Sequence, residues 1–295
     1  DLRKLKPDII MVSSTGYGFY GPWANFGATG PATEGAAGLA YQTGYPGGQP
    51  VMSEIPYTDY TSGEHTVFAV MAALMHRLKT GQGQFVDISQ TQATSSTIPE
   101  VLMDFSANGR SGQRIGNQDV SMSPHGCYPC KGDDRWISVA VTTDAQWQSL
   151  CRVLEESNWA TDIRFEDSLS RWKNREELDS LIGPATAAWD AHELMNALQN
   201  EEVAAGAVFD SKDLLFDPHL IERGFYEVVN HQDKTGIPPL PYASRPWKLS
   251  KTPAVKGKSA PVIGEHNSLI LGELLGKTAE EMTDLEKTGI IGYGP

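Results

Sequence analysis

Apolar residues in the first third of the chain are spaced as in an α/β protein. The run "PDIIMVSST" (residues 7–15) predicts a buried strand that leads into a glycine-rich loop, and "QFVDIS" (84–89) predicts a second strand. Residues 62–79 repeat apolar side chains every three or four positions, which predicts a buried helix. These side chains are Val67, Val70, Met71, Leu74 and Leu78. Further helices are predicted over 33–45, where small residues dominate, and over 90–107.

This alternation of strands and helices predicts an α/β fold with part of a parallel sheet. Strands joined through a helical crossover run parallel, because the crossover carries the chain back to the starting edge. The chain begins with Asp rather than Met, and one short helical turn precedes the first strand. We therefore expect residues 1–107 to be the C-terminal portion of a large domain, whose other strands belong to an N-terminal segment that this chain lacks.

The sequence changes character after this portion. Residues 108–119 are polar and rich in glycine, which is typical of a linker. The stretch "CYPCKGDDRWISVAV" then predicts two strands around a turn, and helices follow it. Their start signals lie at Thr143, Asn174, Asp190 and Asp217. We expect a smaller α+β domain over 120–228.

The remainder of the chain predicts a linker and two closing helices. Residues 229–262 are rich in Pro, Gly and Lys, as expected of a return linker. Within 263–295, helices are predicted over 265–275 and 279–288, each ended by Gly. The second opens with a Thr-x-x-Glu capping box at Thr278.

Composition and charge narrow the classes of partner. The chain has 295 residues, 40% of them hydrophobic, and a net charge of -13. No apolar run reaches the roughly 18 residues of a membrane helix, and the first residues lack a signal-peptide core. We therefore expect no membrane as a partner. An acidic surface repels phosphate backbones, so we expect no nucleic acid as a partner either. A small polyanion could still bind where basic residues gather, with candidates Lys79, Arg110 and Arg114.

The cysteines favour a reducing compartment over a disulfide framework. Their number is odd and low, at three, which fits the cytoplasm. Cys127 and Cys130 lie within the predicted hairpin rather than at a helix start, where a redox pair would lie. His125 could add a third zinc ligand, but no fourth is near. We expect structural thiols and no metal site.

The loop that follows the first strand leaves two interpretations open. Gly16-Tyr17-Gly18 can bring backbone N–H groups close to a phosphate or an oxyanion. It lacks the Gly-Lys-Ser/Thr of a phosphate-binding loop, and no helix follows it as in a dinucleotide-binding motif. A plain turn and a ligand-binding loop therefore remain equal alternatives on pattern alone.

Asp59 lies just ahead of the predicted helix 62–79. Thr61 and Glu64 form a Thr-x-x-Glu capping box, so this helix already has its own start signal. An Asx-turn is the ordinary role for such an Asp. However, the preceding "IPYT" is apolar and extended, so we expect Asp59 to be only partly solvated. An ionised, poorly hydrated carboxylate can act as a nucleophile toward an activated acyl group.

Longer motifs give a family resemblance across nearly the whole chain. The segments "TGYGFYGP", "AAGLAYQTG" and "YTDYTSGEHTVFAVMAALMHRLKTGQGQFVDIS" resemble the class III CoA-transferase family, also called CaiB/BaiF. The likeness continues, in order, through "RIGNQDVSMSPHGCYPCKGDDRWISVAV", "DPHLIERGF" and "PVIGEHNSLILGELLG". The most specific signal is Asp-x-x-x-Gly, an Ala-Ala-Leu helix and Thr-Gly-x-Gly-Gln in succession.

The resemblance implies a fold and an assembly. Members combine a large Rossmann-like domain with a small domain, and the chain passes out and back, so residues 263–295 would return to the large domain. Two subunits interlock as a homodimer. The missing N-terminal segment would hold much of the coenzyme A.

The resemblance also implies a reaction and its site residues. Asp59 falls on the family nucleophile, which attacks an acyl-CoA thioester and forms a mixed anhydride before CoA passes to a second carboxylic acid. CoA is a substrate here, and no further cofactor is implied. The residues expected to bind CoA or substrate are Gly16, Tyr17, Gly18, Gly112, Arg114 and Gly116. The last three lie in the glycine-rich linker, which we interpret as a lid that excludes water.

Alternatives within and outside the enzyme class remain. The family's 2-methylacyl-CoA racemases pair this Asp with a His, whose position falls on Thr29, and no His precedes Asp59. Transfer is therefore favoured over epimerisation, which needs both groups. A CoA-dependent lyase is a third possibility, and a noncatalytic CoA-binding fragment is the alternative outside the enzymes. The donor acyl group and the acceptor acid cannot be read from the sequence.

Overall fold

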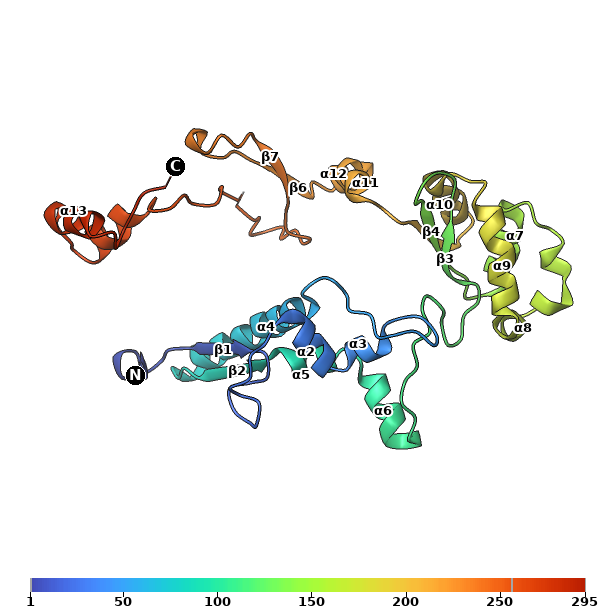
Figure 1. Cartoon of the computed structure of the whole chain (residues 1–295), viewed down its shortest axis with the longest axis horizontal. Helices are drawn as coiled ribbons and strands as arrows, with labels where there is room; N and C mark the ends of the chain where they lie inside the picture. The colour runs from blue at the N-terminus through green and yellow to red at the C-terminus, as the bar shows by residue number, and fades with distance from the viewer. Residues whose placement is uncertain (1, 256, 295) are drawn as a thin grey trace. The chain divides into compact units, whose positions relative to one another are not determined.

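The chain divides into two compact units, residues 1–208 and 209–295. We describe it from a computed structural model, in which residues 2–255 and 257–294 are described (Figure 1). The first residue of the predicted portion 1–107, one residue of the linker 229–262 and the last of 263–295 lie outside the described residues.

The first unit opens with the predicted parallel pair of strands. After the short helix α1 (Leu2–Leu5), β1 (Met11–Thr15) pairs with β2 (Phe85–Ser89). The pairing is parallel and in register from Met11 opposite Phe85 to Thr15 opposite Ser89. The helices between them form the crossover, as predicted from the alternation of strands and helices.

Two predicted helices are each divided in the structure. The helix expected over 33–45 is α2 (Gly30–Ala36) and α3 (Leu39–Gln42), interrupted at Gly38, whose φ is +86°. The helix expected over 90–107 is α5 (Gln90–Ser95) and α6 (Pro99–Asn108). Pro99 opens α6, because proline lacks the N–H that an uninterrupted helix would use at this point.

Helix α4 (Tyr57–Thr80) was predicted as buried, and that prediction is wrong for the described chain. Its buried residues are small or polar: Thr58, Thr61, Ser62 and Ala73. The predicted apolar stripe is largely exposed instead, as the exposed fractions of Val67 (64%), Met71 (56%) and Leu78 (80%) show. The spacing therefore identified the helix correctly but not its surroundings.

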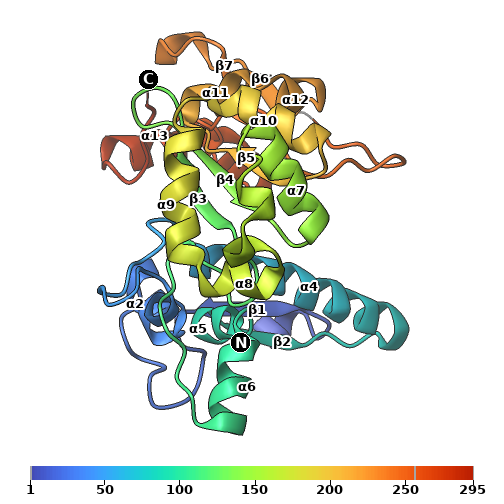
Figure 2. The same cartoon turned by 90° about the vertical axis from the view of Figure 1, so that its right-hand side faces the viewer.

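A three-stranded antiparallel sheet forms the rest of the first unit. β3 (His125–Pro129) and β4 (Trp136–Ala140) are the predicted hairpin, and β5 (Ala204–Ala207), which was not predicted, pairs with β4. Helices pack around this sheet, with α9 against β3 and α10 against β5 (Figure 2). The helices here are α7 (Asp144–Val153), η1 (Trp159–Thr161), η2 (Ile163–Phe165), α8 (Ser168–Lys173), α9 (Arg175–Thr186) and α10 (Ala191–Asn200). The predicted caps Thr143 and Asp190 are confirmed, since each side chain accepts a hydrogen bond from a backbone N–H of the first turn.

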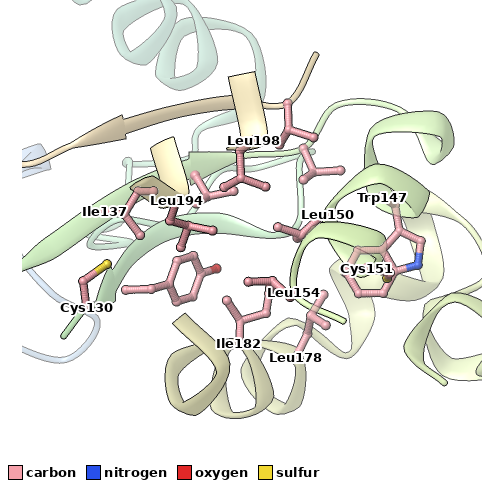
Figure 3. Close-up of a cluster of buried hydrophobic side chains, with 14 of the residues drawn as sticks. Cys130, Ile137, Trp147, Leu150, Cys151, Leu154, Leu178, Ile182, Leu194 and Leu198 are labelled. Carbon is pink, nitrogen blue, oxygen red and sulfur yellow. The ribbon is translucent and has the colours of Figure 1, made fainter. Parts of the chain in front are cut away.

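These elements enclose a dense apolar core (Figure 3). We call it the apolar core: Tyr128, Cys130, Ile137, Val139, Val141, Trp147, Leu150, Cys151, Leu154, Phe165, Leu178, Ile182, Ala191, Leu194, Leu198 and Val203. Arg171 is also fully buried there. Its guanidinium donates to the carbonyls of Ser123 and Phe165 and to the Asp144 carboxylate.

The second unit consists of short elements. They are α11 (Ser211–Phe216), α12 (Pro218–Glu222), β6 (Tyr226–Val229), η3 (Asp233–Thr235), β7 (Leu240–Ala243), η4 (Ser268–Leu274) and α13 (Ala279–Lys287). The predicted cap at Asp217 and the capping box at Thr278 are confirmed. Within 229–262, expected as a linker, β7 pairs antiparallel with β6. Among the described residues, no helix has the length and apolar character needed to cross a bilayer.

Candidate active site

Asp59 lies inside the first turn of α4, rather than ahead of the helix. The helix begins two residues earlier, at Tyr57, and its N-cap position is Pro56. The predicted capping box at Thr61 is therefore wrong. The Thr61 hydroxyl instead donates to the Thr58 carbonyl at 3.2 Å and shares a hydrogen bond with the Thr94 hydroxyl at 2.9 Å. Thr61 joins α4 to α5 and does not start the helix.

The Asp59 carboxylate is exposed and is held by a neighbouring amide. Its side chain was expected to be partly solvated, and in the described chain it is exposed instead. The Gln90 side-chain amide donates a hydrogen bond to Asp59 Oδ1. The backbone around it is fixed, because Asp59 N donates to the Pro56 carbonyl and the Ser62 hydroxyl donates to the Asp59 carbonyl, both at 3.0 Å. The positive end of the helix dipole favours a negative charge at this position.

The carboxyl ends of β1 and β2 meet beside Asp59. Gly16 follows β1 directly, and Gln90 and Thr91 follow β2. The backbone N–H and the hydroxyl of Thr91 both donate to the Gly16 carbonyl, at 3.0 and 2.8 Å. Since Gln90 contacts Asp59, these bonds connect the Gly16 loop to the carboxylate. Ligands in open α/β sheets bind at this edge, outside the carboxyl ends of the strands.

The glycine-rich loop has a defined conformation at this edge. A Cβ on Gly16 would lie 2.3 Å from the Ala28 Cβ, so no larger residue fits there without a shift. Gly18 has a φ of +96°, and its N–H donates to the Thr15 hydroxyl. The Tyr17 ring packs edge-on against Trp23 at 5.6 Å between centroids. The loop is therefore ordered by its own contacts.

Polar contacts that were not predicted support the start of α4. The hydroxyls of Thr33 and Thr58, both fully buried, share a hydrogen bond of 2.8 Å that joins α2 to α4. The buried Glu34 carboxylate accepts from the backbone N–H of Ser53 at 3.0 Å and from its hydroxyl at 2.8 Å. Glu34 thereby anchors the segment that leads into the helix. Its place on a small-residue helix gave no signal in the sequence.

We call the set of residues at this edge the strand-end site. Its members are Gly16, Thr33, Thr58, Asp59, Gln90 and Thr91. Of these six residues, only Gly16 and Asp59 were predicted from the sequence. Gln90 and Thr91 are polar residues directly after a strand of a parallel pair. This position in the sequence could have indicated both of them.

The three candidates in the linker lie against a different segment. The Arg114 guanidinium donates to the carbonyls of Gly48 and Tyr41, and Gly116 N donates to the Gly44 carbonyl. A Cβ on Gly112 would lie 2.0 Å from the Gln42 side chain. Gly116 lines a cavity of about 370 Å³ whose other lining residues are Gln42, Thr43, Gly44, Tyr45, Val51 and Asn117. Asp59 is not among them, so the role of these three in CoA binding stays a prediction.

The thiols have the character expected of structural cysteines. Cys130 and Cys151 are buried, Cys127 is partly exposed, and none forms a disulfide. Burial raises the pKa of the Cys130 thiol to about 11 and that of the Cys151 thiol to about 12. Within residues 2–255 and 257–294, no group of three or more His, Cys, Asp or Glu side chains is placed to hold a metal ion.

Comparison with known proteins decides the family. The family model described as "CoA-transferase family III" matches residues 1–267. The chain belongs to this family. It is 30% identical over 273 residues to the succinate–glutarate CoA-transferase of Agrobacterium fabrum, covering 92% of this chain and 67% of that protein. It is 28% identical over 291 residues to the succinyl-CoA–D-citramalate CoA-transferase of Chloroflexus aurantiacus, covering 99% and 71%.

The structural comparison agrees with this assignment. A crystal structure of a CaiB/BaiF family protein from Brucella suis superposes with a TM-score of 0.82 at 26% identity, covering 92% of this chain and 70% of that one. The predictions of a CoA-transferase and of an α/β fold of this family are thereby confirmed. The chain spans about two thirds of the first relative and 37% of a probable CoA-transferase of Mycobacterium tuberculosis.

Proposed function

We propose that the full-length CoA-transferase that carries this chain moves CoA from an acyl-CoA thioester to a free carboxylic acid, with Asp59 as the covalent nucleophile. The observation that carries the proposal is the position of Asp59. Its carboxylate is exposed at the first turn of α4, held by Gln90 and joined through Thr91 to the Gly16 loop. A fixed and accessible carboxylate at the carboxyl ends of parallel strands suits attack on an acyl group.

The reaction balances with carboxylates and a thiolate alone. An Asp59 oxygen bonds to the thioester carbonyl carbon, and the carbon–sulfur bond breaks to give a mixed anhydride and CoA thiolate. The thiolate then attacks Cγ of Asp59, which releases the donor acid and leaves an aspartyl-CoA thioester. The acceptor carboxylate repeats these steps in reverse order. Each intermediate keeps the activation of the thioester, provided that water is excluded, and the scheme needs no cofactor besides the CoA substrate.

The relatives suggest which acids to test first. The two named above act, by their names, on succinate, glutarate, succinyl-CoA and D-citramalate, and a further relative is named succinyl-CoA:mesaconate CoA-transferase. All of these are dicarboxylic acids or their thioester. We therefore take a dicarboxylic acyl-CoA as the donor and a dicarboxylate as the acceptor for the first assays.

The same proposal includes the assembly and the compartment. We infer an interlocked homodimer from the family resemblance, with light scattering of the full-length protein as its test. Three free thiols, two of them buried, support a cytoplasmic location, where such thiols stay reduced. A monomer in solution would contradict the inferred assembly.

Replacement of Asp59 tests the proposed nucleophile. Asp59→Asn removes the charge at similar size, and we expect it to lower CoA exchange by a factor on the order of 10⁴. Binding of CoA, measured by calorimetry, should persist, because Asn has nearly the size of Asp and its side-chain oxygen can still accept from the Gln90 amide. Glu64→Gln, which changes an exposed carboxylate on the same helix, is the matched control and should retain activity. Unchanged exchange in Asp59→Asn would overturn the assignment.

A further inference from the structure

The contact between Gln90 and Asp59 places a hydrogen-bond donor on one oxygen of the nucleophile. The side-chain amide nitrogen of Gln90 donates to Oδ1 of Asp59. A carboxylate has two equivalent oxygens, and this contact distinguishes them. Because Oδ1 is held by the amide, Oδ2 is the oxygen available to attack a thioester. The anhydride bridge then forms at Oδ2, and Oδ1 becomes the carbonyl oxygen of the aspartyl group.

The segment that presents Gln90 is held on both sides. Gln90 is the first residue of α5, directly after Ser89, whose hydroxyl accepts from the Gln92 N–H at 3.3 Å. Thr91, the next residue, donates twice to the Gly16 carbonyl. Only the side-chain torsions of Gln90 remain free, so the amide stays close to Asp59 at low entropic cost.

The charge on Oδ1 changes from step to step in the proposed reaction. In the resting carboxylate Oδ1 carries about half of a negative charge, and it loses that charge when Oδ2 forms the anhydride. When the CoA thiolate adds to Cγ, the new bond pushes a full negative charge onto Oδ1. Donors that meet a charge only as it develops lower the barrier of that step, since they bind the transition state more tightly than the ground state.

We propose that Gln90 is a catalytic residue that stabilises this oxyanion. Its amide donates to Oδ1 while the sulfur–Cγ bond forms and the Cγ–Oδ2 bond to the bridge breaks, which frees the donor carboxylate and leaves the aspartyl-CoA thioester. The same donation serves when the acceptor carboxylate attacks that thioester at Cγ and expels the CoA thiolate. Gln90 gives no help in the first step, in which Oδ1 loses charge. This assignment rests on the proposed function of Asp59.

Two substitutions separate donation from shape. Gln90→Leu removes the donor, and Gln90→Glu keeps the shape but replaces the donor with an acceptor that repels the Asp59 carboxylate. In the full-length enzyme we expect both to lower kcat for acid exchange by about 10² to 10³. The KM for the acyl-CoA should stay within about twofold, because the contact strengthens only in the transition state. Gln92→Leu is the matched control, since Gln92 is an exposed glutamine on the same short helix.

A second measurement follows formation of the aspartyl-CoA thioester directly. When the wild-type enzyme is mixed with succinyl-CoA in the absence of acceptor acid, mass spectrometry of the rapidly quenched protein should show CoA attached at Asp59. Gln90→Leu should form this adduct about a hundredfold more slowly, while succinyl-CoA binds as before. An adduct that forms at the wild-type rate, a kcat within about threefold of wild type, or a parallel loss of binding and melting temperature would each overturn the proposal. If the wild-type enzyme forms no adduct at Asp59, the proposed function fails instead.

Discussion

Two parts of the first unit bury their residues in different ways. In the apolar core, side chains such as Trp147, Phe165 and Leu194 are fully buried, and the removal of apolar area from water stabilises them. At the strand-end site the buried side chains are those of Thr33 and Thr58, which are hydroxylic and paired with one another. Each such pair contributes only about 1 kcal/mol, but it fixes two helices in a single relative position.

We infer from this difference that the apolar core supplies most of the stability and the strand-end site supplies the chemistry. The apolar core is closed by its own helices, whereas α4 exposes apolar side chains such as Phe68 (78%) and Leu78 (80%). Regions with fewer buried apolar contacts open at lower free energy, and functional residues are often drawn from them. The strand-end site therefore relies on directional hydrogen bonds to hold Asp59.

The largest effect should come from a cavity in the apolar core. Leu194→Ala removes a fully buried side chain from α10, so it should lower the free energy of unfolding by about 2 to 5 kcal/mol. Leu169→Ala, at a position that is 57% exposed, is the matched control and should cost under about 0.5 kcal/mol. Urea titrations give both values. Equal costs at the two sites would contradict the described core.

A smaller effect is expected at the loop after β1. Gly16→Ala places a Cβ 2.3 Å from the Ala28 Cβ, so the backbone must move, at a cost of about 1 to 3 kcal/mol. Thr91, which is next to Gln90, donates two hydrogen bonds to the Gly16 carbonyl. The shift should therefore displace Gln90 and also lower kcat. Gly27→Ala meets no atom within 4 Å and serves as the control. A fully active and equally stable Gly16→Ala variant would remove the proposed link between loop and carboxylate.

The hydroxyls of Thr33 and Thr58 should show energetic coupling in their effect on the free energy of unfolding. Thr33→Val leaves the buried Thr58 hydroxyl without this partner, which costs about 1 to 3 kcal/mol. Thr58→Val should cost less, because the Thr33 hydroxyl also donates to the Gly30 carbonyl at 3.0 Å. The double variant replaces both by apolar groups of the same shape and should cost less than the sum of the singles. A double-mutant cycle from unfolding experiments measures this coupling free energy between the two hydroxyls. Additive costs would show that the two hydroxyls do not interact.

The smallest expected effect is a pH dependence of stability that comes from a buried thiol of the apolar core. Burial raises the pKa of Cys151 from 9.0 to about 12, so the thiol stays protonated in the folded chain at a pH where the unfolded chain loses the proton. This contribution to stability is fully present below pH 9 and is lost as the pH rises toward 12. Native-state labelling at pH 8 should modify the partly exposed Cys127 first. Earlier labelling of Cys151 would contradict its burial.

Local rules predicted the elements more accurately than their surroundings. The β1–β2 pair, the β3–β4 hairpin and the caps at Thr143 and Asp190 follow from spacing and capping chemistry, which act within a few residues. The predicted start of a helix at Thr61 was wrong. Thr61 matches a capping pattern, yet its hydroxyl bonds to Thr94, a partner 33 residues away that no local rule anticipates.

The candidate site was predictable in part for the same reason. Asp59 and the Gly16 loop were found through motifs, but the contact between Gln90 and Asp59 joins positions 31 residues apart. It exists because α4 packs against α5, which begins directly after β2, and this packing is a property of the tertiary fold and not of either segment. Exposure of Asp59 and of the α4 stripe likewise depends on what packs nearby, and spacing alone cannot specify that.

The central claim is that Asp59 becomes covalently linked to each acid in turn, and isotope transfer tests it most directly. The dicarboxylic acceptor is supplied with the heavy isotope at every oxygen of its two carboxylates, and the full-length enzyme turns over with unlabelled succinyl-CoA. Each acceptor bonds to Cγ through one oxygen and leaves that oxygen behind when its acyl carbon passes to CoA. We predict that the peptide containing Asp59 gains a heavy oxygen during turnover. Exchange of CoA with no isotope in that peptide would contradict the account.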